Sequence, residues 1–131
     1  MKQDIKSRED IELLVDEFYK QVLANEVIGP FFTKVIQLDW KKHIPVMYSF
    51  WETVLLKKAT YSGNPIAKHV ALNQKAKLEK AHFAEWLLLW KNTINNHFSG
   101  SVANEAIKRA ETMEKLMWYK IEKSANPNFL Q

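Results

Sequence analysis

The sequence predicts an all-α fold around one apolar core. The chain has 131 residues, 47% of them hydrophobic and only three of them Gly. Apolar residues recur at spacings of three and four along four long stretches, which is the helical period. Five Trp, seven Phe and four Tyr supply large rings for a core. We therefore expect a single domain over 1–131, with loose ends at about 1–7 and 124–131.

The first helix is expected to begin at Ser7. Ser is a good N-cap, and Asp10 three residues later gives a variant of the capping box. The apolar positions of this helix are Ile11, Leu14, Val15, Phe18, Val22 and Leu23. Asn25 and the run IGP (28–30) close it, and FFTKVI (31–36) follows as a short turn or small helix.

A second helical pattern runs through residues 38–58, and Pro45 interrupts it. Proline suits the first turn of a helix far better than its interior. The helix is therefore expected to begin near Pro45 or to kink there, which leaves His43 at its entrance. Its apolar stripe beyond the proline is Met47, Phe50, Trp51, Val54 and Leu55.

The turn-forming run 58–65 precedes a short helical stretch that carries His69. Asn73 is expected to begin the longest regular segment. Its inward positions are Leu78, His82, Phe83, Trp86, Leu89, Trp90 and Ile94. HFSGS (97–101) ends this helix, with Gly100 as its C-cap glycine.

The last helix is expected over residues 102–122. Its inward positions are Ala106, Ile107, Ala110, Met113, Met117 and Ile121. The sequence contains no internal repeat, low-complexity segment or domain linker, so all of these helices are expected to share one core.

Composition narrows the class of protein. Cysteine is absent, so neither a disulfide framework nor a thiolate ligand is available. The formal charge is +4 with lysines spread along the chain, a pattern of solvated faces, so no nucleic-acid partner is expected. The first ten residues lack the apolar region of a signal peptide, and no apolar run approaches ~18 residues. We expect a cytoplasmic protein that has no membrane partner.

Familiar catalytic patterns are missing from the sequence. It has no Gly-rich phosphate loop, no GxSxG and no His-Glu-x-x-His. The four histidines fall on separate elements, so no local pair suggests zinc. Conventional hydrolytic catalysis is therefore not expected.

A set of polar-tipped side chains on inward faces remains. Tyr19 follows Phe18 in the first helix, Trp86 lies on the apolar side of a later one, and His43 stands at a helix entrance. Taken singly, Tyr19 and Trp86 are explained as core residues, and His43 and His69 as surface imidazoles.

Taken together, these residues follow an ordered series of motifs. The series is Phe18-Tyr19, Trp40-x-x-His43, Phe50-Trp51, Tyr61-x-Gly63-x-Pro65-x-x-x-His69 and His82-Phe83-x-x-Trp86. In order and spacing it resembles the truncated haemoglobins, most closely their third group, over about residues 8–120. The resemblance implies the truncated globin fold, a two-over-two helical sandwich around a haem.

The resemblance also implies roles for individual residues. His69 is the proximal ligand of the iron of haem b, which needs one neutral imidazole nitrogen held against the porphyrin. Tyr19, Trp86 and His43 form the distal hydrogen-bond network. The apolar walls of the pocket are Phe32, Met47 and Phe50. Lys68 and His82 are expected to reach the haem propionates, although His82 is equally well explained as a surface residue.

The implied function is binding of O2 at iron. Two hydrogen bonds of ~1.5–3 kcal/mol each to a ligand with partial negative charge slow its release by roughly two to four decades. Slow release of O2 favours a reaction of bound O2 with NO, or a reaction with peroxide, over O2 transport. CO and cyanide are further expected ligands. A nitric oxide dioxygenase or peroxidase-like activity needs an external reductase, because nothing in the sequence indicates a nucleotide or flavin site. We expect a monomer.

Two alternatives remain open at the level of sequence. The aromatic stripe also suits a cofactor-free helical protein-interaction module, whose groove holds a partner helix. A gas sensor with a separate signalling partner is the other alternative. Colour separates the haem protein from the cofactor-free module.

Overall fold

The computed structural model describes residues 2–35, 40–61, 63 and 78–124. Its elements are α1 (Arg8–Ala24), a short helical turn η1 (Phe31–Val35), α2 (Trp40–Leu56), α4 (Lys80–His97) and α5 (Ser101–Ser124). Over this part of the chain the only β pairing is an isolated bridge between Gln3 and Phe98. The predicted all-α class is confirmed.

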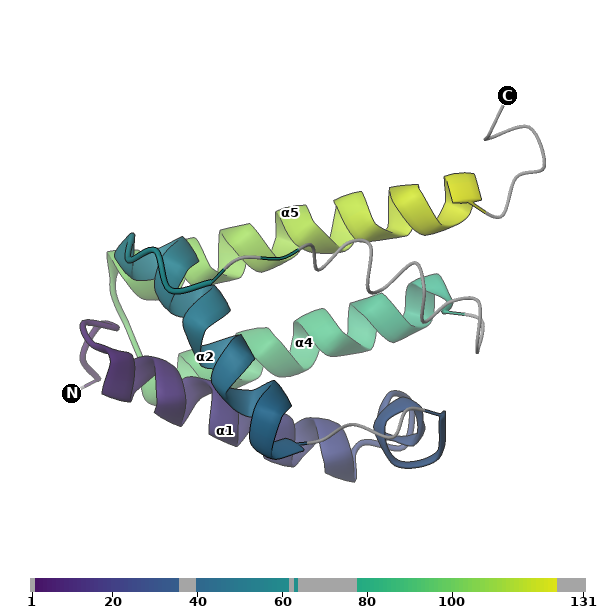
Figure 1. Ribbon diagram of the computed structural model, residues 1–131, viewed down its shortest axis with the longest axis horizontal. Helices are drawn as coiled ribbons and strands as arrows, with labels where there is room; N and C mark the ends of the chain where they lie inside the picture. Colours follow the sequence, from purple (N-terminus) through teal and green to yellow (C-terminus); the bar gives the residue numbers. More distant parts are fainter. Residues whose placement is uncertain (1, 36–39, 62, 64–77, 125–131) are drawn as a thin grey trace.

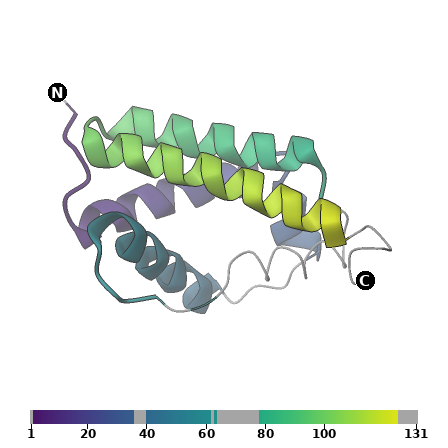
Figure 2. The same ribbon diagram turned by 90° about the horizontal axis from the view of Figure 1, so that it is seen from above.

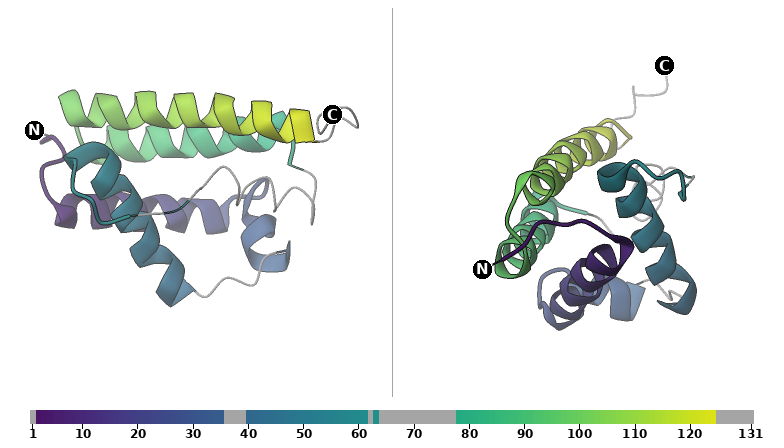
Figure 3. Two further views of the ribbon diagram at one scale, coloured as in Figure 1. Left: turned by 45° about the horizontal axis from the view of Figure 1, so that its top comes forward. Right: turned by 90° about the vertical axis from the view of Figure 1, so that its left-hand side faces the viewer.

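The helices form two layers of two (Figure 1). α4 and α5 run side by side in opposite directions along most of their length (Figure 2). α1 and α2 make the other layer, and α1 packs against both α2 and α4 (Figure 3). This is the two-over-two arrangement that the resemblance implies.

Capping residues explain where α1 begins and ends. The Ser7 hydroxyl accepts a hydrogen bond from the Asp10 amide at 3.3 Å, and the Asp10 carboxylate accepts one from the Lys6 amide at 2.9 Å. The predicted variant of the capping box is therefore present, with one difference: the Asp10 carboxylate binds the amide of Lys6 rather than that of the N-cap residue Ser7. At the other end Asn25 is the C-cap, and its side-chain oxygen accepts from the Val27 amide at 2.9 Å.

α2 begins at Trp40, within the helical pattern predicted over residues 38–58. Of the two expected alternatives, a start near Pro45 is therefore wrong. Pro45 lies inside the helix with its ring exposed to solvent. Proline has no N–H to offer the Lys41 carbonyl, so one intrahelical bond is missing at this point. His43 lies in the first turn, before that interruption.

α4 begins at Lys80, with Glu79 as its N-cap in an extended conformation. The predicted helical positions Leu78 and Glu79 therefore precede the helix, and the predicted start at Asn73 lies outside the described residues. α4 has 18 residues and α5 has 24, so the expectation that the longest helix carries Trp86 is also wrong.

Gly100 belongs to the start of α5 rather than to the end of α4. Phe98 is the C-cap of α4, and the Gly100 carbonyl accepts the amide of Asn104 at 3.0 Å, as an N-cap residue does. Its φ of 147° is one that glycine adopts most easily.

The first turn of α5 is capped from the far end of the chain. The Asp4 carboxylate accepts the amides of Val102 at 3.0 Å and Ala103 at 2.8 Å. Burial raises the pKa of Asp4, but these backbone hydrogen bonds outweigh it and leave the pKa below its ordinary value. Gln3 adds a bond from the Ser99 amide at 3.0 Å. Residues 3–4 thus tie the N-terminal segment to α5.

Aromatic residues join the two layers in the core. Trp51 of α2 stacks on Trp90 of α4 with ring centroids 4.4 Å apart, and Phe18 of α1 meets Trp90 edge-on at 5.0 Å. The Trp90 indole N–H donates to the Ala106 carbonyl of α5 at 3.2 Å. One residue therefore contacts three other helices. No helix in the described ranges is long and apolar enough to cross a membrane.

Candidate functional site

Tyr19 and His43 meet between α1 and α2. The Tyr19 hydroxyl lies 3.4 Å from Nε2 of His43, a long hydrogen bond whose donor depends on the imidazole tautomer. Burial raises the pKa of Tyr19 far above its ordinary value, so the phenol stays protonated at every physiological pH. Two polar tips that the sequence places 24 positions apart thus form one pair.

Trp40, which the sequence analysis did not select, packs against both members of this pair. Its ring centroid lies 5.5 Å from that of Tyr19 and 5.6 Å from that of His43. Phe32 completes the group, 5.8 Å from Trp40 and 6.1 Å from Tyr19. The Trp-x-x-His spacing already indicated that Trp40 lies beside His43, because residues three apart share a helix face.

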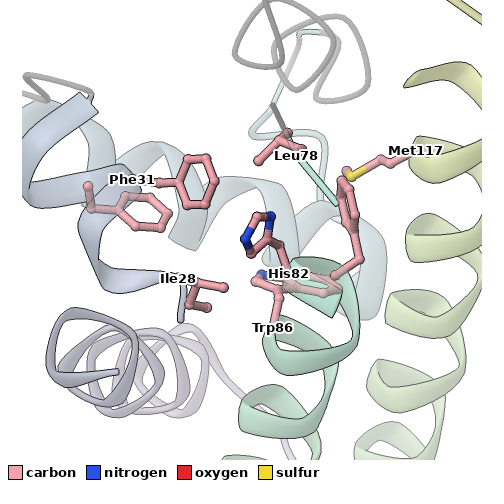
Figure 4. Close-up of a pocket in the computed structure, with 8 residues that line it drawn as sticks. Ile28, Phe31, Leu78, His82, Trp86 and Met117 are labelled. Atoms are coloured by element: carbon pink, nitrogen blue, oxygen red, sulfur yellow. The ribbon is translucent and has the colours of Figure 1, made fainter. Parts of the chain in front are cut away.

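A partly open pocket lies beside this group (Figure 4). Apart from one imidazole and one indole, its walls are apolar, which is the usual character of a ligand pocket. Its lining residues are Ile28, Phe31, Phe32, Leu78, His82, Phe83, Trp86 and Met117. It brings together the predicted residues Phe32, His82 and Trp86.

Phe18 and Phe32 connect the pocket to the Tyr19–His43 pair. Phe32 lines the pocket and contacts Tyr19, while the buried Phe18 lies 5.1 Å from Tyr19 and 6.2 Å from Trp86. Tyr19 and Trp86 therefore flank the same phenyl ring. The predicted distal residues occupy one region, with Trp86 on its α4 side.

His82 has its ring position fixed by the start of α4. Its Nδ1 accepts the backbone N–H of Glu79 at 2.8 Å, so the neutral imidazole carries its proton on Nε2. The ring lies edge-on to Phe31 at 4.8 Å, and Figure 4 shows it among the lining side chains. His82 is thus a pocket residue that offers one N–H donor.

Two predicted wall residues, Met47 and Phe50, lie elsewhere in the described structure. Met47 is half-buried against the core, and Phe50 packs on Trp51 and Tyr61 with ring centroids 5.1 Å from each. Neither lines the pocket. Lys68 and His69 lie outside the described residues, so their predicted roles stay predictions.

Sequence reasoning missed five of the apolar lining residues. They are Ile28, Phe31, Leu78, Phe83 and Met117. Their helical spacing is that of core residues, and Leu78, Phe83 and Met117 do form a small cluster with Ile121. Periodicity shows which residues face inward, but it does not separate a filled core from a pocket wall.

The described residues fit one face of a haem site. The pocket offers aromatic walls for a flat apolar ring, and the protonated Tyr19 hydroxyl lies beside it. No group of three His, Cys, Asp or Glu within the described ranges could hold a metal ion by itself. Iron held among these residues would therefore need most of its ligands from a macrocycle.

Comparison with known proteins agrees with this geometry. No protein-family model matches the sequence. The crystal structure of a group III truncated haemoglobin from Campylobacter jejuni superposes with a TM-score of 0.79 at 26% identity, covering 92% of this chain and 95% of that one. The fold is the truncated globin fold, and this similarity supports the interpretation of the chain as a haem protein of the globin type.

The sequence comparison points to the same group. The group 3 truncated haemoglobin of Campylobacter jejuni is 29% identical over 114 residues, which are 85% of this chain and 87% of the relative. The predicted resemblance to the third group of truncated haemoglobins is confirmed by both comparisons.

Proposed function

We propose that the chain binds haem b, with His69 as the axial ligand of iron and Tyr19, His43 and Trp86 on the opposite face. The observation that carries the proposal is the Tyr19–His43 pair beside an aromatic pocket that Trp86 lines. The motif that ends at His69 supports the axial assignment, as does the similarity to haemoglobins of the third group.

When bound, haem iron supplies a coordination position for small ligands such as O2, NO, CO, cyanide or peroxide. The chain supplies donors around that position. Tyr19 stays protonated and can donate, and the Trp86 indole N–H can only donate. Each bond to a ligand with partial negative charge is worth about 1.5–3 kcal/mol, and more where water is excluded. This arrangement slows ligand release.

His82 and Lys68 are assigned to the haem propionates. The His82 imidazole accepts the Glu79 amide at Nδ1, which leaves Nε2–H as its donor. An N–H donor at the pocket suits a carboxylate, and a lysine adds charge. Replacing His82 by Phe should therefore speed haem loss without changing the axial ligand.

Slow ligand release favours chemistry on O2 with NO, or on peroxide, over O2 transport. The two distal donors would stabilise negative charge as it develops on the ligand. Such a reaction consumes electrons, and we assign their supply to an external reductase.

The absorption spectrum of the purified protein tests the proposal. We expect a haem Soret band, with His69→Ala losing haem or retaining it only with added imidazole. His97→Ala serves as the matched control, because His97 is exposed at the end of α4. A His69→Ala protein with an unchanged ferrous spectrum would refute the axial assignment. A colourless chain that folds and refuses hemin would instead support the cofactor-free interaction module.

A further inference from the structure

Polar contacts join α1 and α2 at three levels along their lengths, and the first level also includes a 3.5 Å contact from Arg8 to the Ser49 hydroxyl. Arg8 Nη1 lies 2.9 Å from Glu52 Oε1, the Tyr48 hydroxyl donates to the Asp16 carboxylate, and Tyr19 meets His43 at 3.4 Å. Early residues of α1 pair with late residues of α2, as antiparallel helices require. The distal pair is thus the last contact of a series.

The contact at Glu52 is a buried charge. Glu52 is 4% exposed, and it accepts hydrogen bonds from Thr60 at 2.8 Å and from Arg8 at 2.9 Å. The hydrogen bond from Thr60 lowers the pKa of Glu52, burial opposes it, and Arg8 adds to the lowering. The carboxylate is therefore ionised at neutral pH. Removing its partners would strand a buried charge, so this pair disfavours other alignments of the two helices.

The contact at Tyr48 is connected to the first one through Arg8. Burial raises the pKa of Tyr48, as does its hydrogen bond to Asp16, so the phenol remains a donor. The Arg8 guanidinium lies over the Tyr48 ring, 5.9 Å from its centroid. Arg8, Asp16, Tyr48 and Glu52 therefore form one network, which we call the α1–α2 clamp.

We propose that the α1–α2 clamp consists of positioning residues that set the distance between Tyr19 and His43. Tyr19 follows Asp16 by one helical turn, so the two share a face of α1. Sliding one helix by a single residue moves its side chains by about 1.5 Å. A contact already at 3.4 Å would not survive such a shift. The clamp itself rests on geometry alone, while its effect on ligand release rests on the proposed function.

Ligand release tests the clamp in two variants. Tyr48→Phe removes only the hydroxyl, and Glu52→Gln removes the charge but keeps the shape. We expect O2 to dissociate about three- to tenfold faster in each variant. A tenfold change in rate corresponds to ~1.4 kcal/mol. In a Tyr19→Phe background the same substitutions should change the rate by less than about twofold, because the contact that they position is gone.

A matched control separates positioning from general stability. Lys91 and Glu111 form an ion pair between α4 and α5 at 3.4 Å, away from the distal pair. Glu111→Gln should leave ligand release unchanged. If the clamp variants lower the midpoint of urea unfolding but leave the dissociation rate unchanged, or act equally in the Tyr19→Phe background, the clamp is only structural and the proposal is wrong.

A second readout does not depend on ligand binding. In the purified 131-residue chain, as the carbonmonoxy form or without haem if it binds none, we expect a nuclear Overhauser contact between the Tyr19 and His43 rings. Tyr48→Phe should weaken this contact and Glu111→Gln should preserve it. An undiminished contact in Tyr48→Phe overturns the clamp even if haem binds, while failure to bind haem overturns only the proposed function.

Discussion

The Tyr19 hydroxyl and the His43 imidazole lie 3.4 Å apart where the C-terminal half of α1 faces the first turn of α2. The phenol is protonated, because burial raises its pKa. Aromatic rings surround the pair, and the pocket lies next to it. The two side chains therefore form a polar pair in an otherwise apolar region.

Replacing Tyr19 by Phe removes one donor and leaves the ring. We expect O2 dissociation to accelerate by about tenfold to a hundredfold, since a hydrogen bond to a charged group is worth about 1.5–3 kcal/mol. Flow mixing of the oxygenated protein with a CO solution measures the rate. Tyr119→Phe, at an exposed tyrosine of α5, is the control. An unchanged rate would remove Tyr19 from the distal network.

Replacing Trp40 by Leu removes the ring that contacts both Tyr19 and His43. His43 would lose one wall, so its imidazole should occupy more than one rotamer. We expect a rise of about two- to fivefold in the same dissociation rate, smaller than for Tyr19→Phe, because the donors remain. A larger effect than that of Tyr19→Phe would show that Trp40 acts on more than this pair.

Replacing Asp4 by Ala removes the cap of α5. We expect a loss of about 1 kcal/mol in the free energy of unfolding at pH 7, as for other N-cap deletions. The pKa of Asp4 is lowered in the folded state from its ordinary 3.8, so its contribution is complete above that value and disappears as the pH falls through the folded pKa. Urea unfolding at pH 7 and near pH 3 checks this. A difference between wild type and variant that does not shrink in acid would contradict the assignment.

Replacing Gly100 by Ala should destabilise the protein by at least about 1 kcal/mol. Its φ is 147°, and an added Cβ would clash with the side chain of Asp4. Thermal unfolding measures the effect. In an Asp4→Gly background the steric part should vanish, because residue 4 then has no Cβ, Cγ or carboxylate to meet the new methyl group, and only the backbone strain should remain. The two substitutions should therefore not be additive. Full additivity would mean that the carboxylate does not meet the new methyl group.

The helices were predictable because their signals are local. Ser7 with Asp10 marks the start of α1, Asn25 marks its end, and the apolar period continues between them. The start of α2 was not predictable, because Pro45 weakens a helix interior by a local rule that tertiary packing overrides. Trp40 packs against Tyr19 and Phe32, and these contacts hold the first turn in place.

The site was predictable only through ordered motifs. Tyr19, His43 and Trp86 look like ordinary inward residues until several elements bring them together. The clamp had no sequence signal at all, since Arg8 and Glu52 are 44 positions apart and each resembles a surface charge. The prediction that Gly100 is the C-cap of α4 was wrong for a related reason. Gly100 lies at the start of α5 beside Asp4, which is 96 positions earlier in the sequence.

The cap on α5 has a consequence for how the chain is made. Asp4 and the Val102 amide are 98 positions apart. During synthesis the Asp4 carboxylate, which is the acceptor, is therefore made long before the Val102 amide, which is the donor. The opening turn of α5 gains this partner only once the chain has been synthesised from residue 4 through residue 103 and the two segments have met. A peptide cut to α5 alone would begin with frayed, water-exposed amides, and its helicity in isolation would understate what the complete chain achieves.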